Sequence, residues 1–281
     1  MELPTLRWVN QPLTRLIQQT FYRNFYGRRA VMTLEEYFSG HSRAAVAFSG
    51  GADSAYLLWA AKRFGCRVRA YYARTAFQPA FELRDAQRLA GELEIPLKVV
   101  ELDVLQCPGA VENGAQRCYH CKKAIFTALL DAARTDGTPL LLDGTNASDD
   151  VSQRPGYQAL QELGIVSPLR LCGITKAELR RRSREAGLFT HAKPAYACLA
   201  TRIPTGTPIR ADDLRRVEQA EEALFRLGFS DLRVRLLGNT ACIQLPEAQL
   251  LPALQGRGAI QEALSGLFER TVLDLTPRKG E

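Results

Sequence analysis

The chain has 281 residues, enough to bury one large core or two modest ones without disulfide or metal staples. Hydrophobic residues make up 46% and charged residues 24% of it, a balance typical of a soluble globular protein. No apolar run is long enough to span a bilayer, and residues 1–40 contain no continuous apolar segment of the kind that a secretory signal needs. We therefore expect a cytoplasmic protein with no membrane partner.

The net charge is +7, which favours phosphate-rich partners but does not distinguish small nucleotides from RNA. The arginines at positions 180–182 form either an RNA-binding patch or, more commonly for such a run, the solvated face of a helix. We favour the solvated face and do not expect a nucleic-acid partner.

Strands and helices are predicted to alternate through the first half of the chain. The predicted strands are 43–48, 67–72, 97–102 and 139–142, and the predicted helices between them are 54–64, 79–93 and 119–133. This alternation is typical of an α/β fold with a doubly wound, mostly parallel sheet, in which ligands bind beyond the carboxyl ends of the strands. A capping box from Thr33 to Glu36 predicts that the ordered fold begins near Met32, which leaves 1–32 as an arm of unknown role.

The last third of the chain has a different order of predicted elements. A helix over 175–186 is followed by a long loop with three prolines between 194 and 208. Beyond it we predict a helix over 213–227, strands over 231–237 and 240–245, a helix over 247–265 and a strand over 269–275. These elements predict a small α+β domain over 206–281, next to a larger domain over 33–205.

The most informative segment connects the first predicted strand to its helix and reads Ser49-Gly50-Gly51-Ala52-Asp53-Ser54. The two glycines permit a tight turn and close approach of a ligand to the backbone. The free N–H groups of the helix start and the hydroxyls of Ser49 and Ser54 then form an anion site. Asp53 is suited either to cap the helix or to hold the Mg²⁺ that accompanies a triphosphate. The alternative is an ordinary glycine turn, and the Walker pattern is absent.

A second polar loop follows the apolar residues 140–142 and reads Asp143-Gly144-Thr145-Asn146. Since it follows a predicted parallel strand, we expect these residues at the same edge of the sheet as the glycine loop, bound to the nucleotide. The alternative is a plain turn, because Asp, Gly and Asn are common turn residues.

Seven cysteines in a chain without a secretory signal are expected to be reduced thiols. Three of them lie in apolar or strand-like stretches and are predicted to be core residues: Cys66, Cys172 and Cys242. Cys107 lies in a predicted loop, and the sequence does not assign it a role.

Cys118 and Cys121 are three residues apart near the start of a predicted helix, so both sulfurs lie on one face and can reach one ion. A single pair of this kind leaves a redox dithiol, half of a zinc site and chance open. Cys198 is a third candidate, on the loop expected to fold back over the nucleotide. Three cysteine ligands would leave one iron of a [4Fe–4S] cluster open to an exogenous sulfide, because four is the usual complement.

Taken together, the motifs resemble the LarE family, the ATP-dependent sulfur transferases of nickel-pincer nucleotide biosynthesis, within the PP-loop ATP pyrophosphatase superfamily. The hexapeptide at 49–54 matches the SGGxDS signature of the superfamily. The motifs shared with the family are RCYHCKK (117–123), DGTNASD (143–149), RPG (154–156), KPAYACLATRIPTG (193–206), AEEALFRLGF (220–229) and RVR (233–235). The resemblance covers residues 33–281.

The resemblance implies that ATP and Mg²⁺ are used to adenylate a carboxylate of pyridinium-3,5-biscarboxylic acid mononucleotide, with release of pyrophosphate, before a sulfur nucleophile displaces AMP. The family has two sulfur sources. In one, the cysteine that matches Cys198 gives up its own sulfur and becomes dehydroalanine; in the other, three cysteines carry a [4Fe–4S] cluster. With Cys118, Cys121 and Cys198, this chain resembles the cluster type, and the family also implies a homo-oligomer.

Four further residues resemble the family's substrate-binding positions. Arg202, Arg233 and Arg235 match the basic residues around the substrate phosphate, and Glu221 matches an acidic residue near the same pocket. The alternatives are surface arginines on a loop and a strand and, for Glu221, a solvated helix face.

Two other functions remain possible from the sequence. One is a tRNA thiolase of the PP-loop superfamily, which also uses three cysteines and a cluster and suits the positive charge. The other is a non-catalytic relative that binds a nucleotide or zinc. The intact SGGADS segment argues against the second, and the lack of a recognisable RNA-binding module argues against the first.

Overall fold

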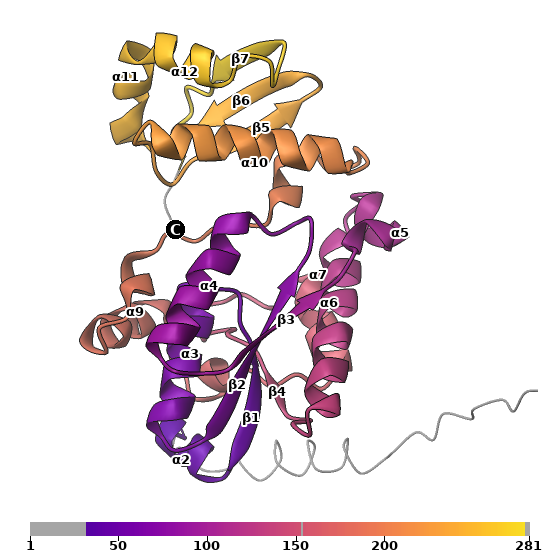
Figure 1. Ribbon diagram of the computed structural model, residues 1–281, viewed down its shortest axis with the longest axis vertical. Helices are drawn as coiled ribbons and strands as arrows, with labels where there is room; N and C mark the ends of the chain where they lie inside the picture. Colours follow the sequence, from indigo (N-terminus) through magenta and orange to yellow (C-terminus); the bar gives the residue numbers. More distant parts are fainter. Residues whose placement is uncertain (1–31, 153, 279–281) are drawn as a thin grey trace, which may run out of the picture. The chain divides into compact units, whose positions relative to one another are not determined.

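A parallel four-stranded sheet carries the loops singled out above (Figure 1). The computed structural model describes residues 32–152 and 154–278. The strands are β1 (Arg43–Ala47), β2 (Arg67–Arg74), β3 (Leu97–Glu101) and β4 (Leu141–Leu142), in the order β3-β2-β1-β4. The chain therefore moves outward from β1 to β3 and then returns to the other side of β1. The predicted doubly wound α/β class is confirmed.

Helices cover both faces of this sheet, with α3 and α4 on one side and α6 and α7 on the other (Figure 1). Ala45 and Tyr71 pack with Leu129 and Leu160 on the α6 and α7 side, as the alternation of side chains along a strand requires. The helices of this part are α2 (Leu34–Ser39), α3 (Ala52–Arg63), α4 (Ala80–Glu92), α5 (Pro108–Val111), α6 (Arg117–Thr135), α7 (Pro155–Glu162), α8 (Pro168–Leu171) and α9 (Lys176–Glu185). Short 3₁₀ turns are η1 (Val104–Gln106), η2 (Phe189–Ala192) and η3 (Leu199–Arg202).

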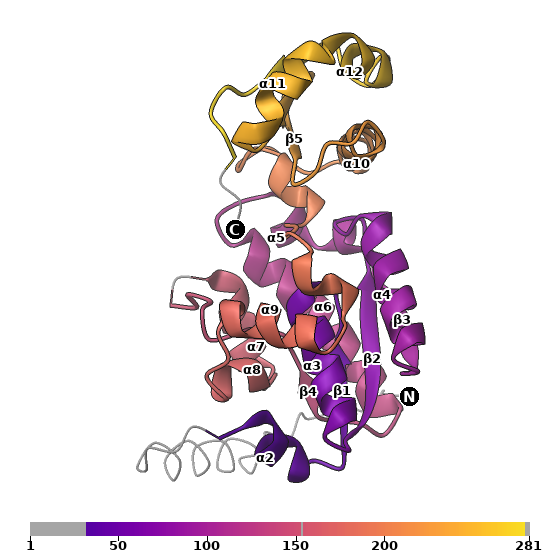
Figure 2. The same ribbon diagram turned by 90° about the vertical axis from the view of Figure 1, so that its left-hand side faces the viewer.

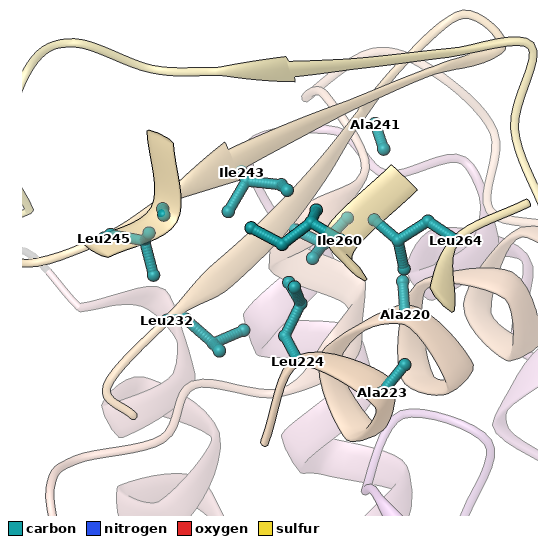
Figure 3. Packing of buried hydrophobic residues seen from close by; sticks show 11 residues of the cluster. Ala220, Ala223, Leu224, Leu232, Ala241, Ile243, Leu245, Ile260 and Leu264 are labelled. Carbon is teal, nitrogen blue, oxygen red and sulfur yellow. The ribbon is translucent and has the colours of Figure 1, made fainter. Parts of the chain in front are cut away.

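The second sheet has three strands, β5 (Arg233–Leu237), β6 (Thr240–Gln244) and β7 (Arg270–Leu273). Strand β6 pairs antiparallel with β5 and parallel with β7. Helix α10 (Ala211–Arg226), seen end-on in Figure 2, packs against β5. Leu224, Ile243 and Ile260 meet in the core between the helices and the sheet (Figure 3).

One helix predicted in the C-terminal part of the chain is divided into two in the structure. The single helix expected over 247–265 divides into α11 (Glu247–Gln255) and α12 (Arg257–Ala263). Gly256, a weak helix former, lies between them, and its N–H closes the last turn of α11 on the carbonyl of Pro252 at 2.9 Å. The predicted order of elements is otherwise present.

The described residues from Thr33 onward belong to one compact unit. The capping box at Thr33 is confirmed, since its hydroxyl accepts from the Glu36 N–H and the Glu36 carboxylate accepts from the Thr33 N–H. The predicted arm lies outside the described residues, apart from Met32. An apolar cluster joins Phe77 and Leu199 to Val217 and Leu236, across the predicted boundary at residue 205.

Two further predictions concern the burial of three cysteines and the absence of a membrane span. Cys66 and Cys172 are buried as predicted, but Cys242 is half-buried, because Ala241 and Ile243 are the β6 residues that point into the core. Within residues 32–152 and 154–278, no helix combines the length and the apolar composition that a membrane span requires.

Candidate functional site

The loop after β1 has the geometry of a phosphate-binding turn. Gly50 has a φ of +72°, and a Cβ there would lie 2.7 Å from the carbonyl oxygen of Glu82, so a side chain is excluded. Gly51 is the N-cap of α3, so no side chain of the N-cap residue occupies the helix start. The hydroxyls of Ser49 and Ser54 lie 3.2 Å apart beside it.

The loop after β4 lies against the same helix start. Val46 of β1 pairs with Leu142 of β4, so the two loops leave neighbouring strands at the point where the strand order reverses. A Cβ on Gly144 would lie 2.8 Å from the backbone nitrogen of Ser54, so glycine permits this approach. Asn146 Nδ2 donates to Asp53 Oδ1 at 3.2 Å.

Asp143 and Thr145 hold that loop in shape. The buried Asp143 carboxylate accepts from the hydroxyls of Ser167 and Thr145 and from the Thr145 N–H at 3.2 Å. Burial raises the pKa of Asp143 above its ordinary value. Its side chain thus contacts the loop and Ser167.

Two lysines that sequence analysis did not select reach the glycine loop. Lys176 Nζ lies 2.5 Å from Asp53 Oδ2, and Lys193 Nζ donates to the Gly50 carbonyl at 3.1 Å while pairing with Asp85 at 2.5 Å. Each Asp53 oxygen keeps a second lone pair, so the carboxylate can still bind a cation. Lys193 begins the KPAYAC segment, five residues before Cys198, and therefore couples the cysteine loop to the phosphate loop.

Two of the three predicted thiols lie at the start of α6, and the third lies at the start of η3. Cys118 is exposed, Cys121 is half-buried one turn further along α6, and Cys198 is the N-cap of η3. Burial raises the pKa of Cys121 to about 12, and the thiols of Cys198, Cys118 and Cys107 add to this rise. Burial also raises the pKa of Cys198, which the cation of Arg117 opposes.

Thiols are soft donors of the kind that bind zinc and iron–sulfur clusters. Among the described residues, no group of three or more His, Cys, Asp or Glu side chains is arranged to hold a metal ion. A [4Fe–4S] cluster makes a different demand, because each thiolate binds a different iron of the cube and the sulfurs lie further apart. Cys121 and Cys198 pack half-buried against apolar side chains, whereas Cys118 is exposed.

Arg202 and Glu221 form a buried ion pair, each about 1% exposed. Glu221 accepts from Arg202 Nε at 2.7 Å and Nη2 at 3.0 Å, from the Val234 N–H at 2.8 Å, and from the hydroxyl of Tyr196. The remaining Arg202 nitrogen donates to the carbonyl of Ala197 at 2.9 Å. The pair therefore fixes the cysteine loop to α10.

Arg233 and Arg235 lie on the same face of β5, but they differ in their exposure to solvent. Arg233 is buried, donates to the carbonyls of Ala195 and Leu232 at 2.8 Å each, and lies 4.9 Å from the centre of the Tyr196 ring. Burial lowers its pKa to about 10. Arg235 is exposed and donates to Gln244 at 2.8 Å.

A cavity of about 480 Å³ lies between the start of α4, the segment 193–196, α10 and β5. Its aromatic side chains are Phe81, Tyr196 and Phe225, and the rings of Phe81 and Tyr196 meet edge to face at 4.9 Å. Its cationic side chains are Arg84, Lys193, Arg226 and Arg233. Of the predicted substrate residues, Arg233 and Glu221 line this cavity; Arg202 and Arg235 do not.

A half-buried carboxyl, Glu82, lies between the phosphate loop and this cavity. Burial raises its pKa to about 7, while Lys193, Arg202 and Arg233 lower it and Asp85 raises it further. No sequence motif marks Glu82, because its burial depends on the packing of α4 against Gly50.

The chain is similar to several known proteins. No family model matches the chain. The chain is 37% identical over 225 residues to an uncharacterised protein of Synechocystis, covering 79% of this chain and 83% of the relative. It is 34% identical over 236 residues to the pyridinium-3,5-bisthiocarboxylic acid mononucleotide synthase of Lactiplantibacillus plantarum, covering 83% and 86%. A shorter match, 34% over 109 residues, covers 38% of this chain and 32% of a tRNA(Ile)-lysidine synthase of Polaromonas naphthalenivorans.

The second of these relatives matches most of the length of both chains, and the third shares part of a PP-loop domain. The chain belongs to the LarE family of the PP-loop superfamily.

Proposed function

We propose that this protein is an ATP-dependent sulfurtransferase that converts a carboxylate of pyridinium-3,5-biscarboxylic acid mononucleotide into a thiocarboxylate. The Lactiplantibacillus plantarum relative is named for the synthesis of pyridinium-3,5-bisthiocarboxylic acid mononucleotide, which supports the substrate class. The observation that carries the proposal is the contact from Lys193 to Gly50, because it links the cysteine loop to the phosphate loop. An activated carboxylate and a sulfur nucleophile must meet in one place.

The first step is adenylation. A substrate carboxylate oxygen attacks the α-phosphorus of ATP, and pyrophosphate leaves, which turns a poor electrophile into an acyl adenylate. The N–H groups at the start of α3 and the hydroxyls of Ser49 and Ser54 bind the phosphates. Lys176 offsets the charge that moves onto pyrophosphate, and Asp53 would hold Mg²⁺, which supplies further charge neutralisation there. Asn146 orients Asp53, and Gly144 with Thr145 shapes the opposite wall.

The second step is transfer of sulfur. A hydrosulfide equivalent attacks the acyl carbon, the bond to AMP breaks, and a thiocarboxylate remains. In the form that we favour, Cys118, Cys121 and Cys198 would hold a [4Fe–4S] cluster, which would supply the sulfide. In the alternative form, the thiolate of Cys198 attacks the acyl carbon and releases AMP. Loss of the Cα proton and cleavage of the Cβ–S bond of residue 198 then leave the thiocarboxylate and dehydroalanine.

The cavity beside Tyr196 suits the mononucleotide. The edges and faces of Phe81 and Tyr196 can pack against a cationic pyridinium ring. Arg233 and the exposed Arg84 supply positive charge for its phosphate, and Arg235 extends this face of β5. Glu221 acts in this scheme by holding Arg202 and Tyr196 in place.

A tRNA thiolase is the second candidate, because the chain is basic and shares a segment with a tRNA(Ile)-lysidine synthase. The arginines of α9 do not favour it. Arg181 and Arg182 are paired with Glu178, and Arg181 also with Glu185, so much of that charge is offset within the helix. Salt-dependent binding of tRNA would support this candidate.

The test is pyrophosphate release that depends on both ATP and the mononucleotide, followed by mass spectrometry of the product for exchange of oxygen for sulfur. Asp53→Ala is expected to abolish pyrophosphate release, and Asp212→Ala, an exposed carboxylate at the start of α10, to retain it. Release at the wild-type rate from Asp53→Ala would overturn the phosphate-site assignment. Release that depends on tRNA instead of the mononucleotide would favour the thiolase, and no release from wild type would favour a non-catalytic protein.

A further inference from the structure

The three arginines at positions 180–182 do not share one environment in α9. Arg181 is exposed and pairs with two carboxylates of its own helix. Arg180 is half-buried, and its guanidinium group donates instead to two backbone carbonyls beyond the end of the helix, those of His191 and Lys193, at 3.2 Å each. Arg181 therefore lies on the solvated face that the sequence predicts, whereas Arg180 holds the segment that leads to Lys193.

Lys193 lies between the phosphate loop and the cavity. Its side chain is 16% exposed, and its Nζ atom donates to the Gly50 carbonyl at 3.1 Å and pairs with Asp85 at 2.5 Å. The same atom lies 5.3 Å from the centre of the Phe81 ring, and both residues line the cavity. A cation at this position can offset the repulsion between a substrate carboxylate and the phosphates of ATP as they approach each other.

The turn that precedes Lys193 is short. Residues Phe189–Ala192 form the single 3₁₀ turn η2, and the Lys193 N–H donates back to the Thr190 carbonyl at 3.1 Å. Turns of this type have poorer hydrogen-bond geometry than α-helices, and Pro194, which follows, has no N–H to donate. The planar fork of Arg180 is suited to fix two carbonyls of this segment at once.

Helix α9 places a second cation at the same loop. Lys176 precedes Arg180 by four residues, so the two lie on one face of the helix, and Lys176 pairs with Asp53 at 2.5 Å. Lys176 makes this contact directly from the helix, whereas Lys193 makes its contacts from the end of the segment that Arg180 holds. Loss of the Arg180 fork should therefore release Lys193 and leave Lys176 in place.

We propose that Arg180 is a positioning residue, whose fork keeps the ammonium group of Lys193 between the phosphate loop and the cavity, where Lys193 binds the substrate carboxylate during adenylation. The part that Lys193 plays in the reaction rests on the proposed function. An ammonium group has three donor hydrogens, so Lys193 can bind the carboxylate while Gly50 and Asp85 keep their contacts.

The first experiment locates Lys193 without the reaction. The folded, full-length protein is treated briefly with acetic anhydride, and the acetylation rate of each lysine is read by peptide mass spectrometry. Arg180→Ala should raise the rate at Lys193 by about fivefold or more, because its ammonium group exchanges its partners for solvent, and should leave the rate at Lys176 unchanged. Arg181→Ala is the matched control, with both rates as in wild type. An unchanged rate at Lys193 in Arg180→Ala would overturn the inference.

The second experiment is a double-variant cycle on pyrophosphate release that depends on ATP and the mononucleotide. Arg180→Ala should lower kcat by about tenfold or more and leave the KM for ATP unchanged, because a displaced Lys193 no longer meets the carboxylate. Lys193→Met should lower kcat at least as far. Adding Arg180→Ala to Lys193→Met should cause no further loss, since a residue that acts through Lys193 then has nothing left to position.

Losses that multiply in the double variant would contradict the inference, because they would show that Arg180 acts independently of Lys193. Wild type that releases no pyrophosphate would remove the proposed function and with it the part of Lys193 in the reaction. The acetylation rates would still decide whether Arg180 positions Lys193, so the two failures are distinguishable.

Arg180→Lys keeps both experiments informative if Arg180→Ala fails to fold, which urea unfolding would show. It retains the positive charge but replaces the planar fork with a single ammonium group, so we expect an acetylation rate at Lys193 and a kcat between those of wild type and Lys193→Met or Arg180→Ala. Wild-type values of both quantities in Arg180→Lys would contradict positioning by the fork.

Discussion

The side chain of Arg117 donates to Asn113 Oδ1 at 2.7 Å and to the carbonyl of Ala200 at 3.1 Å. Asn113 is fully buried and donates in turn to the carbonyls of Pro204 at 2.8 Å and Thr207 at 2.9 Å. Arg117 also lies 3.7 Å from the Cys118 sulfur. These two residues thus tie the start of α6, with its cysteines, to the segment that follows Cys198.

The first prediction concerns Asn113. Asn113→Ala should destabilise the protein by about 1–3 kcal/mol, because buried carbonyls lose their donors. It should also increase the alkylation rate of Cys198 in iron-free protein and leave that of the buried Cys66 unchanged. Asn113 has a φ of +56°, so Asn113→Gly separates backbone strain from lost hydrogen bonds. Urea unfolding and mass spectrometry measure both effects; equal stability of Asn113→Ala and wild type would contradict the assignment.

The second prediction concerns the buried pair of Arg202 and Glu221. Glu221→Gln should cost about 3–5 kcal/mol of unfolding free energy, because it leaves the Arg202 charge buried without its partner. The double variant Arg202→Met with Glu221→Leu should lose less than either single variant. Glu222→Gln, on the exposed side of α10, is the control. A Glu221→Gln protein of wild-type stability that fails to bind the mononucleotide would instead favour direct substrate binding by Glu221.

The third prediction tests the close approach of the two loops. Gly144→Ala should abolish the rise in melting temperature that ATP produces, because the added Cβ would lie 2.8 Å from the Ser54 nitrogen at the phosphate site. Gly91→Ala is the control: its Cβ meets open space on α4, and the change should stabilise the helix by about 0.5–1 kcal/mol. An unchanged ATP shift in Gly144→Ala would refute the assigned packing.

The fourth prediction is a pH dependence of stability. The pKa of Glu82 rises from 4.5 to about 7 on folding, so the folded chain binds more protons in this window than the unfolded chain. The contribution of Glu82 to stability should therefore fall as pH rises from 4.5 to about 7 and level off above it, with a slope of at most about 1.4 kcal/mol per pH unit. Glu82→Gln should remove this slope.

Urea unfolding below and above the window, compared between wild type and Glu82→Gln, checks the fourth prediction. The groups that face Glu82 are Lys193, Asp85, Arg202 and Arg233, and each remains in the variant. An identical pH profile for the two proteins would show that Glu82 ionises normally.

The fifth prediction separates the two arginines of β5. Replacing Arg233 and Arg235 together with Ala should weaken mononucleotide binding by about 1–3 kcal/mol for each lost charge-assisted hydrogen bond. Arg233→Ala should also lower stability, because the carbonyls of Ala195 and Leu232 lose a donor, whereas the exposed Arg235 should affect binding alone. Calorimetric titration and urea unfolding distinguish these outcomes, and unchanged affinity of the double variant would remove both residues from the substrate site.

The local sequence determined much of this protein. Hydrophobic periodicity and glycine position define the strand, turn and helix around 49–54, since these depend on neighbours in the chain and on the angles that Gly50 alone adopts easily. The sequence motifs identified the family and selected the three cysteines as candidates. The alternation of strands and helices predicted the doubly wound sheet. The break at Gly256 was not predicted, because one glycine and one proline are too weak a local signal to end a helix by themselves.

Only the tertiary structure decided which groups meet. Lys176 is 123 residues from Asp53, Lys193 is 143 residues from Gly50, and no periodicity connects positions so far apart. The same holds for Cys107 and Cys121, which pack on the same apolar cluster although 14 residues separate them. The pairing of Arg202 with Glu221 also depends on the tertiary structure, because a charge removed from water requires a partner close by.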